Sequence, residues 1–172
     1  MRHHEPLRLP RGLEAHPRDA PPRHRQPRPH LPCRAQENLP LPIACAFLEQ
    51  ESSGGQNVFG HDPTIFVGAG KVTKSKYRRY KRQRDAQLPD GDRRMQGVGP
   101  MQLTWFEFQD DADKIGGCHK PAKNMAVGFG LVRDYLNEFN DNIVDAGEKY
   151  NGSRDYGEEV KAKTEVWRGR LP

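Results

Sequence analysis

The chain has 172 residues, with 28 Lys and Arg against 23 Asp and Glu, which gives a formal charge of +5. This length is typical of one domain with, at most, a tail. No run approaches the ~18 apolar residues that a membrane-spanning helix needs. Three cysteines exclude a disulfide scaffold, because their odd number leaves at least one thiol unpaired within the chain.

Residues 1–37 differ in composition from the rest of the chain. They contain eight Arg, eight Pro and five His against four acids, and no Lys, Ser, Thr, Asn, Val, Ile or aromatic residue. Their charge is therefore +4, whereas the remaining 135 residues carry +1. A segment so rich in proline and so poor in apolar residues predicts neither a helix nor a core. It also lacks the apolar stretch of a secretion signal.

Three interpretations of residues 1–38 stay open. The segment is a basic arm that binds anionic polymers, a plain disordered extension, or the product of a misassigned start or of GC-rich DNA translated in another frame. The third fits the abundance of Arg, Pro, Ala and His and the lack of Lys, Ser and Thr. The folded domain is expected to occupy residues 39–172.

A buried helix is predicted to begin at Pro42, a residue that suits the first turn of a helix. Ile43, Phe47 and Glu51 follow at spacings of four and share a face. The sequence Ser-Ser-Gly-Gly at residues 52–55 tolerates the left-handed conformation that ends many helices.

Glu51 is the first candidate functional residue. Apolar surroundings raise the pKa of a carboxyl group, and so does the negative end of a helix dipole. A glutamic acid that stays protonated near neutral pH is what a general acid for glycosidic cleavage requires. The plain alternative is a solvated side chain at a helix end.

A basic segment covers residues 71–84, where eight of fourteen residues are Lys or Arg and Tyr77 and Tyr80 lie among them. We expect an exposed helix within an otherwise polar, loop-rich stretch. Nucleic-acid binding is one interpretation, a solvated helical face is a second, and attraction to anionic cell-wall polymers is a third.

No strand ladder is expected, and the remaining elements are predicted to be helices. Residues 97–100, Gly-Val-Gly-Pro, indicate a tight backbone path that a ligand can approach closely. Thr104 and Glu107 have the spacing of a capping box, which would open a helix that ends near Gly116.

Three more helices complete the predicted set. Pro121 begins one, with an apolar stripe along one face. Asp141 and Asp155 are the expected N-caps of the other two. The last helix has Val160 and Thr164 on one face. The sequence therefore predicts a mainly α domain.

Four segments, in this order, resemble the lytic transglycosylase domain of the soluble (SLT) type, in the lysozyme-like superfamily that includes goose-type lysozymes. They are similar, more closely, to the transglycosylase-like domain of endolysins from phages of actinobacteria. The resemblance implies about six helices around a substrate cleft. Pro100 and Lys149 stand where the family usually carries Leu and Ala. The four segments are Ala46–Gly54, Gly97–Thr104, Asn124–Gly128 and Lys149–Gly152.

The resemblance also implies roles for individual residues. Glu51 would be the single catalytic acid/base, and Ser52 would hydrogen-bond near it and help orient it. The helix that starts near Asn124 would pack beneath the cleft. Met101 and Gln102 would contact the sugar beside the scissile bond. Tyr150 and Asn151 would hold the substrate or Glu51 from across the cleft.

The implied reaction cleaves the MurNAc-β-1,4-GlcNAc bond of peptidoglycan. Glu51 would protonate the glycosidic oxygen and then take the proton of the MurNAc 6-hydroxyl, which closes a 1,6-anhydro ring. If Asp62 activates water, the same cleft would hydrolyse the bond, as a lysozyme does. Asp62 is otherwise a turn residue of the segment Gly60-His61-Asp62-Pro63.

No cofactor is expected, and no metal, because Cys45, Cys118 and His119 lack a four-ligand pattern. Cys45 is expected to be reduced, although its pairing with Cys118 stays open. The expected partner of a monomer is the peptidoglycan glycan strand, with no specific nucleic acid and no membrane span. Without a signal segment, we expect a phage or prophage endolysin in the host cytoplasm that reaches the wall after holin-type release, or a virion-associated lysin. Two alternatives are a non-catalytic cell-wall-binding protein and a nucleic-acid-binding protein that uses residues 71–84.

Overall fold

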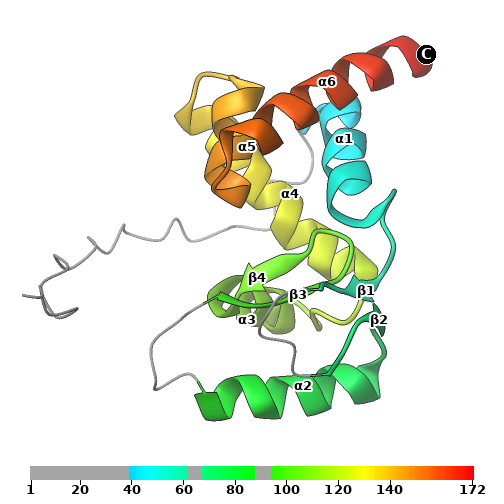
Figure 1. The fold of residues 1–172 in the computed structure, drawn as a ribbon, viewed down its shortest axis with the longest axis vertical. Helices are drawn as coiled ribbons and strands as arrows, with labels where there is room; N and C mark the ends of the chain where they lie inside the picture. The colour runs from blue at the N-terminus through cyan, green and yellow to red at the C-terminus, as the bar shows by residue number, and fades with distance from the viewer. Residues whose placement is uncertain (1–38, 62–66, 88–93) are drawn as a thin grey trace, which may run out of the picture. The chain divides into compact units, whose positions relative to one another are not determined.

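Helices dominate the computed structural model, which describes residues 39–61, 67–87 and 94–172, all within one unit (Figure 1). The chain is therefore mainly α, as predicted. In these ranges the elements are α1 (Leu41–Ser52), β1 (Val58–Phe59), β2 (Gly70–Lys71), α2 (Lys74–Gln87), β3 (Arg94–Val98), β4 (Leu103–Trp105), α3 (Phe106–Lys114), α4 (Pro121–Glu138), α5 (Ile143–Asn151) and α6 (Arg154–Arg170).

A small antiparallel sheet with the order β2-β1-β3-β4 corrects the expectation that the chain has no strand ladder. Phe59 pairs with Gly70 on one side and with Val98 on the other, and Val98 pairs with Leu103. The strands are two to five residues long. Segments so short carry too little alternation of apolar and polar residues to be recognised from the sequence.

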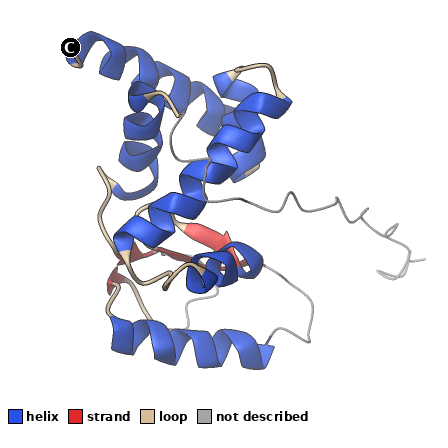
Figure 2. Cartoon of the chain, turned by 180° about the vertical axis from the view of Figure 1, so that it is seen from behind, coloured by secondary structure: helices blue, strands red, loops and turns tan. Residues whose placement is uncertain are grey.

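The helix α4 joins two groups of elements (Figures 1 and 2). It packs against α5 toward its C-terminal end and against α3 toward its N-terminal end, where the sheet also lies. Pro121 begins α4, as predicted. Val132 and Leu136, from the predicted apolar stripe, are fully buried.

The helix α6 packs against both α5 and α1. Two glycines allow α5 and α6 to approach closely. A Cβ on Gly147 would lie 2.8 Å from the Cα of Gly157, and a Cβ on Gly157 would overlap the carbonyl oxygen of Val144. Val160 and Thr164, the predicted inner face of α6, are fully buried.

The helix α2 has one buried face, which corrects the expectation of a simply solvated basic helix. Tyr77, Tyr80 and Arg84 are buried and follow one another at spacings of three and four. Arg84 is 1% exposed, and its guanidinium lies 2.7 Å from Asp85 and 2.7 Å from Asp110 of α3. Lys81 also pairs with Asp110 and Asp113 of α3, so two of the eight cations of the basic segment hold the helix to its neighbour.

Three predicted helix caps are wrong in position. The helix α3 begins at Phe106, and its N-cap residue, Trp105, provides no side-chain hydrogen bond. Asn142, rather than Asp141, caps α5 by accepting hydrogen bonds from two backbone amides. Ser153 stands at the N-cap of α6, so that Asp155 lies in the first turn. Asp141 instead has a φ of 61°, a left-handed conformation that a helix N-cap does not use.

None of the helices in the described parts of the chain combines the length and the apolar character needed to cross a membrane.

Candidate functional site

Glu51 lies half-buried in the last turn of α1, where the sequence predicts it. Ser53 follows with a φ of 53° and ends the helix in the left-handed conformation. The hydroxyl of Tyr156, in the first turn of α6, donates a short hydrogen bond to Oε1 of Glu51. A hydrogen bond from a buried phenol fixes the orientation of the carboxyl group.

Tyr150, at the end of α5, is the second tyrosine near this carboxylate. Its hydroxyl donates to the carbonyl oxygen of Met101 at 2.7 Å. The ring of Phe47 lies between the two tyrosines, with its centroid 5.4 Å from that of Tyr150 and 6.2 Å from that of Tyr156. The two tyrosines are thus packed in place from α5 and α6.

Burial, followed by the negative charge of Glu51, raises the pKa of Tyr150 and of Tyr156. Both tyrosines consequently keep their protons at neutral pH. They are hydrogen-bond donors toward the carboxylate and the turn after β3.

Ser52 joins α1 to that turn. Its hydroxyl donates to the carbonyl oxygen of Pro100 at 2.7 Å and accepts from the amide of Gly55 at 3.1 Å. These partners are backbone groups. Ser52 therefore positions the end of α1, and with it Glu51, through hydrogen bonds to the backbone.

A side chain of α4 binds the backbone of the turn between β3 and β4. Asn124 is fully buried, accepts from the amide of Met101 at 2.9 Å and donates to the carbonyl of Val98 at 2.7 Å. Gly99 has a φ of 78°, and a Cβ there would lie 2.6 Å from the side chain of Asn124. Gly128, one helical turn after Asn124, leaves room for the Met101 side chain, which a Cβ at that position would overlap. Asn124 and Gly128 together therefore fix the position of this turn on α4.

The structure contradicts the expectation that the Met101 side chain contacts a sugar. Met101 is 0% exposed and packs into the core against Gly128. Only its backbone reaches the other site residues. Gln102 is half-buried with a φ of 41°, and its amide nitrogen donates to the carbonyls of Val58 and Gly99. These bonds brace the turn against β1.

Asn151 does not join this cluster. Asn151 is exposed at the end of α5. Asp62, the possible second carboxylate, lies outside the described residues, and its neighbour His61 is exposed. The structure thus brings Glu51, Tyr150 and the backbone of the turn together.

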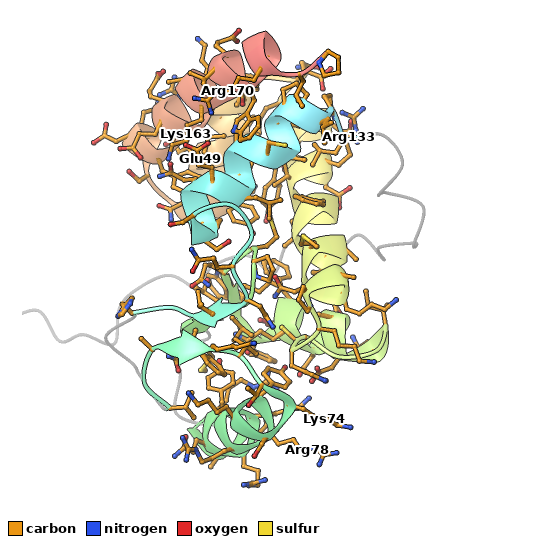
Figure 3. All side chains as sticks on the ribbon, turned by 90° about the vertical axis from the view of Figure 1, so that its right-hand side faces the viewer. Glu49, Lys74, Arg78, Arg133, Lys163 and Arg170 are labelled. Atoms are coloured by element: carbon orange, nitrogen blue, oxygen red, sulfur yellow. The ribbon has the colours of Figure 1, made fainter. Side chains whose placement is uncertain are left out.

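Tyr156 is the site residue that the sequence analysis missed. A signal was present, because Tyr156 precedes Val160 by four residues and so extends the buried stripe of α6 by one turn. The same helix bears side chains that bind α1. The indole nitrogen of Trp167 donates to Glu49 at 2.8 Å, and Lys163 donates to Gln50 (Figure 3). These contacts keep α1 and α6 in the register that brings Tyr156 to Glu51.

Cys45 and Cys118 are both free thiols, which answers the question of their pairing. Burial raises the pKa of both thiols, that of Cys118 to about 12. Within the described ranges, no three His, Cys, Asp or Glu side chains gather as a metal site would require.

No protein-family model, no curated protein and no solved structure matches this chain.

Proposed function

We propose that the protein is a peptidoglycan-cleaving enzyme that acts as a phage or prophage endolysin. It breaks the MurNAc-β-1,4-GlcNAc bond with Glu51 as the acid/base and forms 1,6-anhydroMurNAc. The observation that carries the proposal is the hydrogen bond from Tyr156 to Glu51, next to the anchored Tyr150. Three of the four family-like segments contribute to this cluster, from the end of α1, the turn after β3 and the end of α5.

The proposed chemistry needs one carboxyl group and no co-reactant. The Glu51 proton passes to the glycosidic oxygen as the bond from that oxygen to C1 of MurNAc breaks. The substrate's own 2-acetamido group stabilises the positive charge that develops on C1. The 6-hydroxyl oxygen of the same MurNAc then bonds to C1, and its proton returns to Glu51. Microscopic reversibility lets a single group be the acid first and the base afterwards.

The neighbours of Glu51 suit these two roles. The hydroxyl of Tyr156 holds one carboxyl oxygen and thereby sets the direction in which Glu51 presents its proton. The Tyr150 hydroxyl is committed to the carbonyl of Met101, so it fixes the turn rather than the carboxyl group. Tyr156 is accordingly a positioning residue, and Glu51 is the proposed catalytic residue.

Mass spectrometry of the muropeptides released from purified peptidoglycan tests the proposal, with wild type compared with Glu51→Gln. We expect wild-type products lighter by one water than hydrolytic ones and a loss of about 10²–10⁴-fold in the variant, the usual contribution of a general acid/base. Glu165→Gln is the control, since Glu165 is exposed on α6 and its ion pair with Arg168 lies on the surface. It should retain activity.

Two results would overturn parts of the proposal. Products with ordinary reducing ends would replace transglycosylation by hydrolysis and make Asp62→Asn the next variant. Equal release by wild type and by folded Glu51→Gln, or no release by folded wild type, would remove Glu51 from the catalytic role.

A further inference from the structure

The helix α2 carries a stripe of three cations on its outer face. Lys74, Arg78 and Arg82 follow one another at spacings of four, so they project from the same side of the helix. All three are exposed, and Figure 3 shows Lys74 and Arg78 pointing away from the body of the helix. Among the residues that the structure describes, no acid forms an ion pair with any of them.

This stripe borders a cavity of about 440 Å³. The ring of Tyr77 stacks on the imidazole of His119 at its edge, with centroids 5.8 Å apart. Asp113, an acid in the cavity wall, already accepts three hydrogen bonds. It accepts from the hydroxyl of Tyr77, from Nζ of Lys81 at 2.5 Å and from the amide of Cys118 at 2.9 Å.

The other acid in the cavity wall, Asp85, accepts two hydrogen bonds from Arg84. Lys81 and Arg84 pair with these two acids and also with Asp110. With Lys74, Arg78 and Arg82 counted, five cations stand against three acids, which leaves a net charge of +2. The cavity consequently presents a positive field to solvent.

The direction in which the pKa of His119 shifts agrees with this positive field. Burial lowers the pKa of His119, and the charges of Lys120, Lys74 and Arg78 lower it further, against the opposing effect of Asp113. A cation is disfavoured at this position because several are already near. An anion bound in the cavity would relieve that repulsion and raise the pKa of His119.

The spacing of the cations indicates the shape of the anion. Residues four apart in a helix are about 6 Å apart along its axis, the length scale of one repeat of a short phosphodiester chain. Lys74, Arg78 and Arg82 therefore match three successive phosphates along a linear polymer. Phosphate groups also suit Arg and Lys as hydrogen-bond donors.

The aromatic residues of α2 argue against a nucleic acid as that polymer. Single-stranded nucleic acids are commonly bound by bases stacked on aromatic side chains. Tyr77 and Tyr80 are 4% and 0% exposed, so neither offers a ring face to a base. The interleaving of aromatic and basic residues in the sequence thus reflects a buried face and a charged face of one helix.

We propose that the α2 surface, formed by Lys74, Arg78, Arg82 and His119, binds a polyol-phosphate chain of the cell wall. The choice of the wall as the source of the phosphodiester rests on the proposed function. The three cations pair with successive phosphates, and His119 donates to a phosphate oxygen at the edge of the cavity. Binding there holds the enzyme on the wall and leaves Glu51 to the glycan strand.

Isothermal titration of the full chain with poly(glycerol phosphate) tests the binding. The triple variant Lys74→Gln, Arg78→Gln, Arg82→Gln should bind about 10-fold more weakly than wild type, or weaker still. The matched control neutralises three other exposed cations, with Lys71→Gln, Arg79→Gln and Lys161→Gln. Residues 1–38 are the same in all variants, so their charge contributes equally.

The control should lose less than about 3-fold, because its three cations lie outside the stripe and their removal changes only the screened, longer-range attraction. Equal losses in the two triple variants would overturn the proposal in favour of nonspecific attraction between charges. A parallel titration with duplex DNA tests the remaining alternative, that the surface binds any polyanion. If the α2 variant loses DNA binding as strongly as polymer binding, the surface is a general polyanion site and the assignment to wall polymer is wrong.

NMR of the His119 imidazole supplies a readout at a single residue. Glycerol phosphate should shift the His119 resonances saturably and raise the pKa of His119 in wild type, and the shift should vanish in the α2 triple variant. Unchanged His119 resonances at saturating polymer would overturn the assignment of His119 to the site.

The two proposals can fail separately. Glu51→Gln should bind poly(glycerol phosphate) as wild type does, whereas the α2 triple variant should release muropeptides at the wild-type rate from glycan stripped of phosphate polymers. If polymer binding remains but wild type releases nothing, only the proposed function falls. If release from stripped glycan remains but the α2 variant binds polymer like wild type, only the α2 surface falls.

Discussion

A tyrosine hydroxyl donates to a carboxylate in two regions of this molecule, from Tyr156 to Glu51 and from Tyr77 to Asp113. At Asp113 the same carboxyl oxygen also accepts from Lys81 at 2.5 Å, and a backbone amide binds the other oxygen. That network ties α2 to α3 and neutralises the acid with a cation. In this region the phenol is one part of an ion-pair network that stabilises the fold.

At Glu51 the environment is built differently. Tyr156 donates to Glu51, and burial, followed by the charge of Glu51, raises the pKa of both Tyr150 and Tyr156. A phenol orients a carboxylate without supplying a positive charge. The comparison shows that one chemical pair stabilises structure beside α2 and positions a candidate acid beside α1.

The largest effect is expected from a substitution that breaks the helix packing bringing Tyr156 to Glu51. In Gly157→Ala the new Cβ would overlap the carbonyl oxygen of Val144, so α5 and α6 must separate. We expect a loss of about 3 kcal/mol in the free energy of unfolding, measured by urea denaturation. Gly169→Ala, in the same helix with open space around it, is the control. It should gain about 0.5 kcal/mol, and similar changes in both variants would contradict the packing argument.

The next effect concerns the other region. Arg84→Leu removes a buried guanidinium and leaves Asp110 and the side-chain oxygen of Gln109 without that donor. We expect the free energy of unfolding to fall by about 2 kcal/mol, with muropeptide release retained by the folded protein. Arg79→Leu, on the exposed face of α2, should change the stability by less than about 0.5 kcal/mol. Equal destabilisation would show that Arg84 has no special structural role.

A smaller effect distinguishes a positioning hydroxyl from a structural one. Tyr156→Phe keeps the buried ring and removes the donor to Glu51. We expect a stability loss of about 1 kcal/mol and a fall in kcat of about 10-fold, with KM unchanged. Tyr80→Phe removes a buried hydroxyl that donates to Gln109 at 2.9 Å. It should show the same stability loss with kcat unchanged, and a fall in kcat there would contradict the distinction.

The smallest effect is the contribution of His119 to the pH dependence of stability. The pKa of His119 is lowered from 6.5 in the folded protein, mainly by burial and by Lys120. Below 6.5 the unfolded chain therefore binds more protons than the folded one, so this contribution is full above 6.5 and decreases as the pH falls through the window beneath it. His119→Gln should flatten the stability curve there, in urea unfolding at several pH values. An unchanged difference from wild type across the window would contradict this origin.

Local signals in the sequence were enough for several helix boundaries. Pro42 stands in the first turn of α1, and the left-handed Ser53 ends it, as predicted. Pro121 likewise begins α4. The ring of proline and the conformations that serine and glycine tolerate are properties of single residues. Such boundaries can be recognised without knowing the rest of the fold.

Other features depend on distant partners. The pairing of Phe59 with Val98 joins segments almost forty residues apart, and no local pattern announces it. The burial of Met101 follows from the small Gly128 on α4. A motif that resembles a substrate-binding segment therefore contributes its backbone to the site and its methionine to the core.

The charge pattern of α2 was visible in the sequence, but its division was not. The spacing of the cations shows which residues share a face, whereas the presence of Asp110 on α3 decides that Arg84 is the buried one. Tyr77 and Tyr80 are buried with it, and their hydroxyls also donate to side chains of α3, those of Asp113 and Gln109. The exposed stripe consists of cations that have no partner on α3: Lys74, Arg78 and Arg82.

By itself the sequence determined a mainly α chain, a carboxylate in the last turn of α1 and a strongly basic helix at α2, because helix periodicity and composition are local. Tertiary structure alone decided that Tyr156 reaches Glu51 and that Asn124 holds the turn beside it. Those contacts join residues up to about a hundred positions apart. They exist because close helix packing, permitted at Gly157, brings the ends of α1, α5 and α6 together.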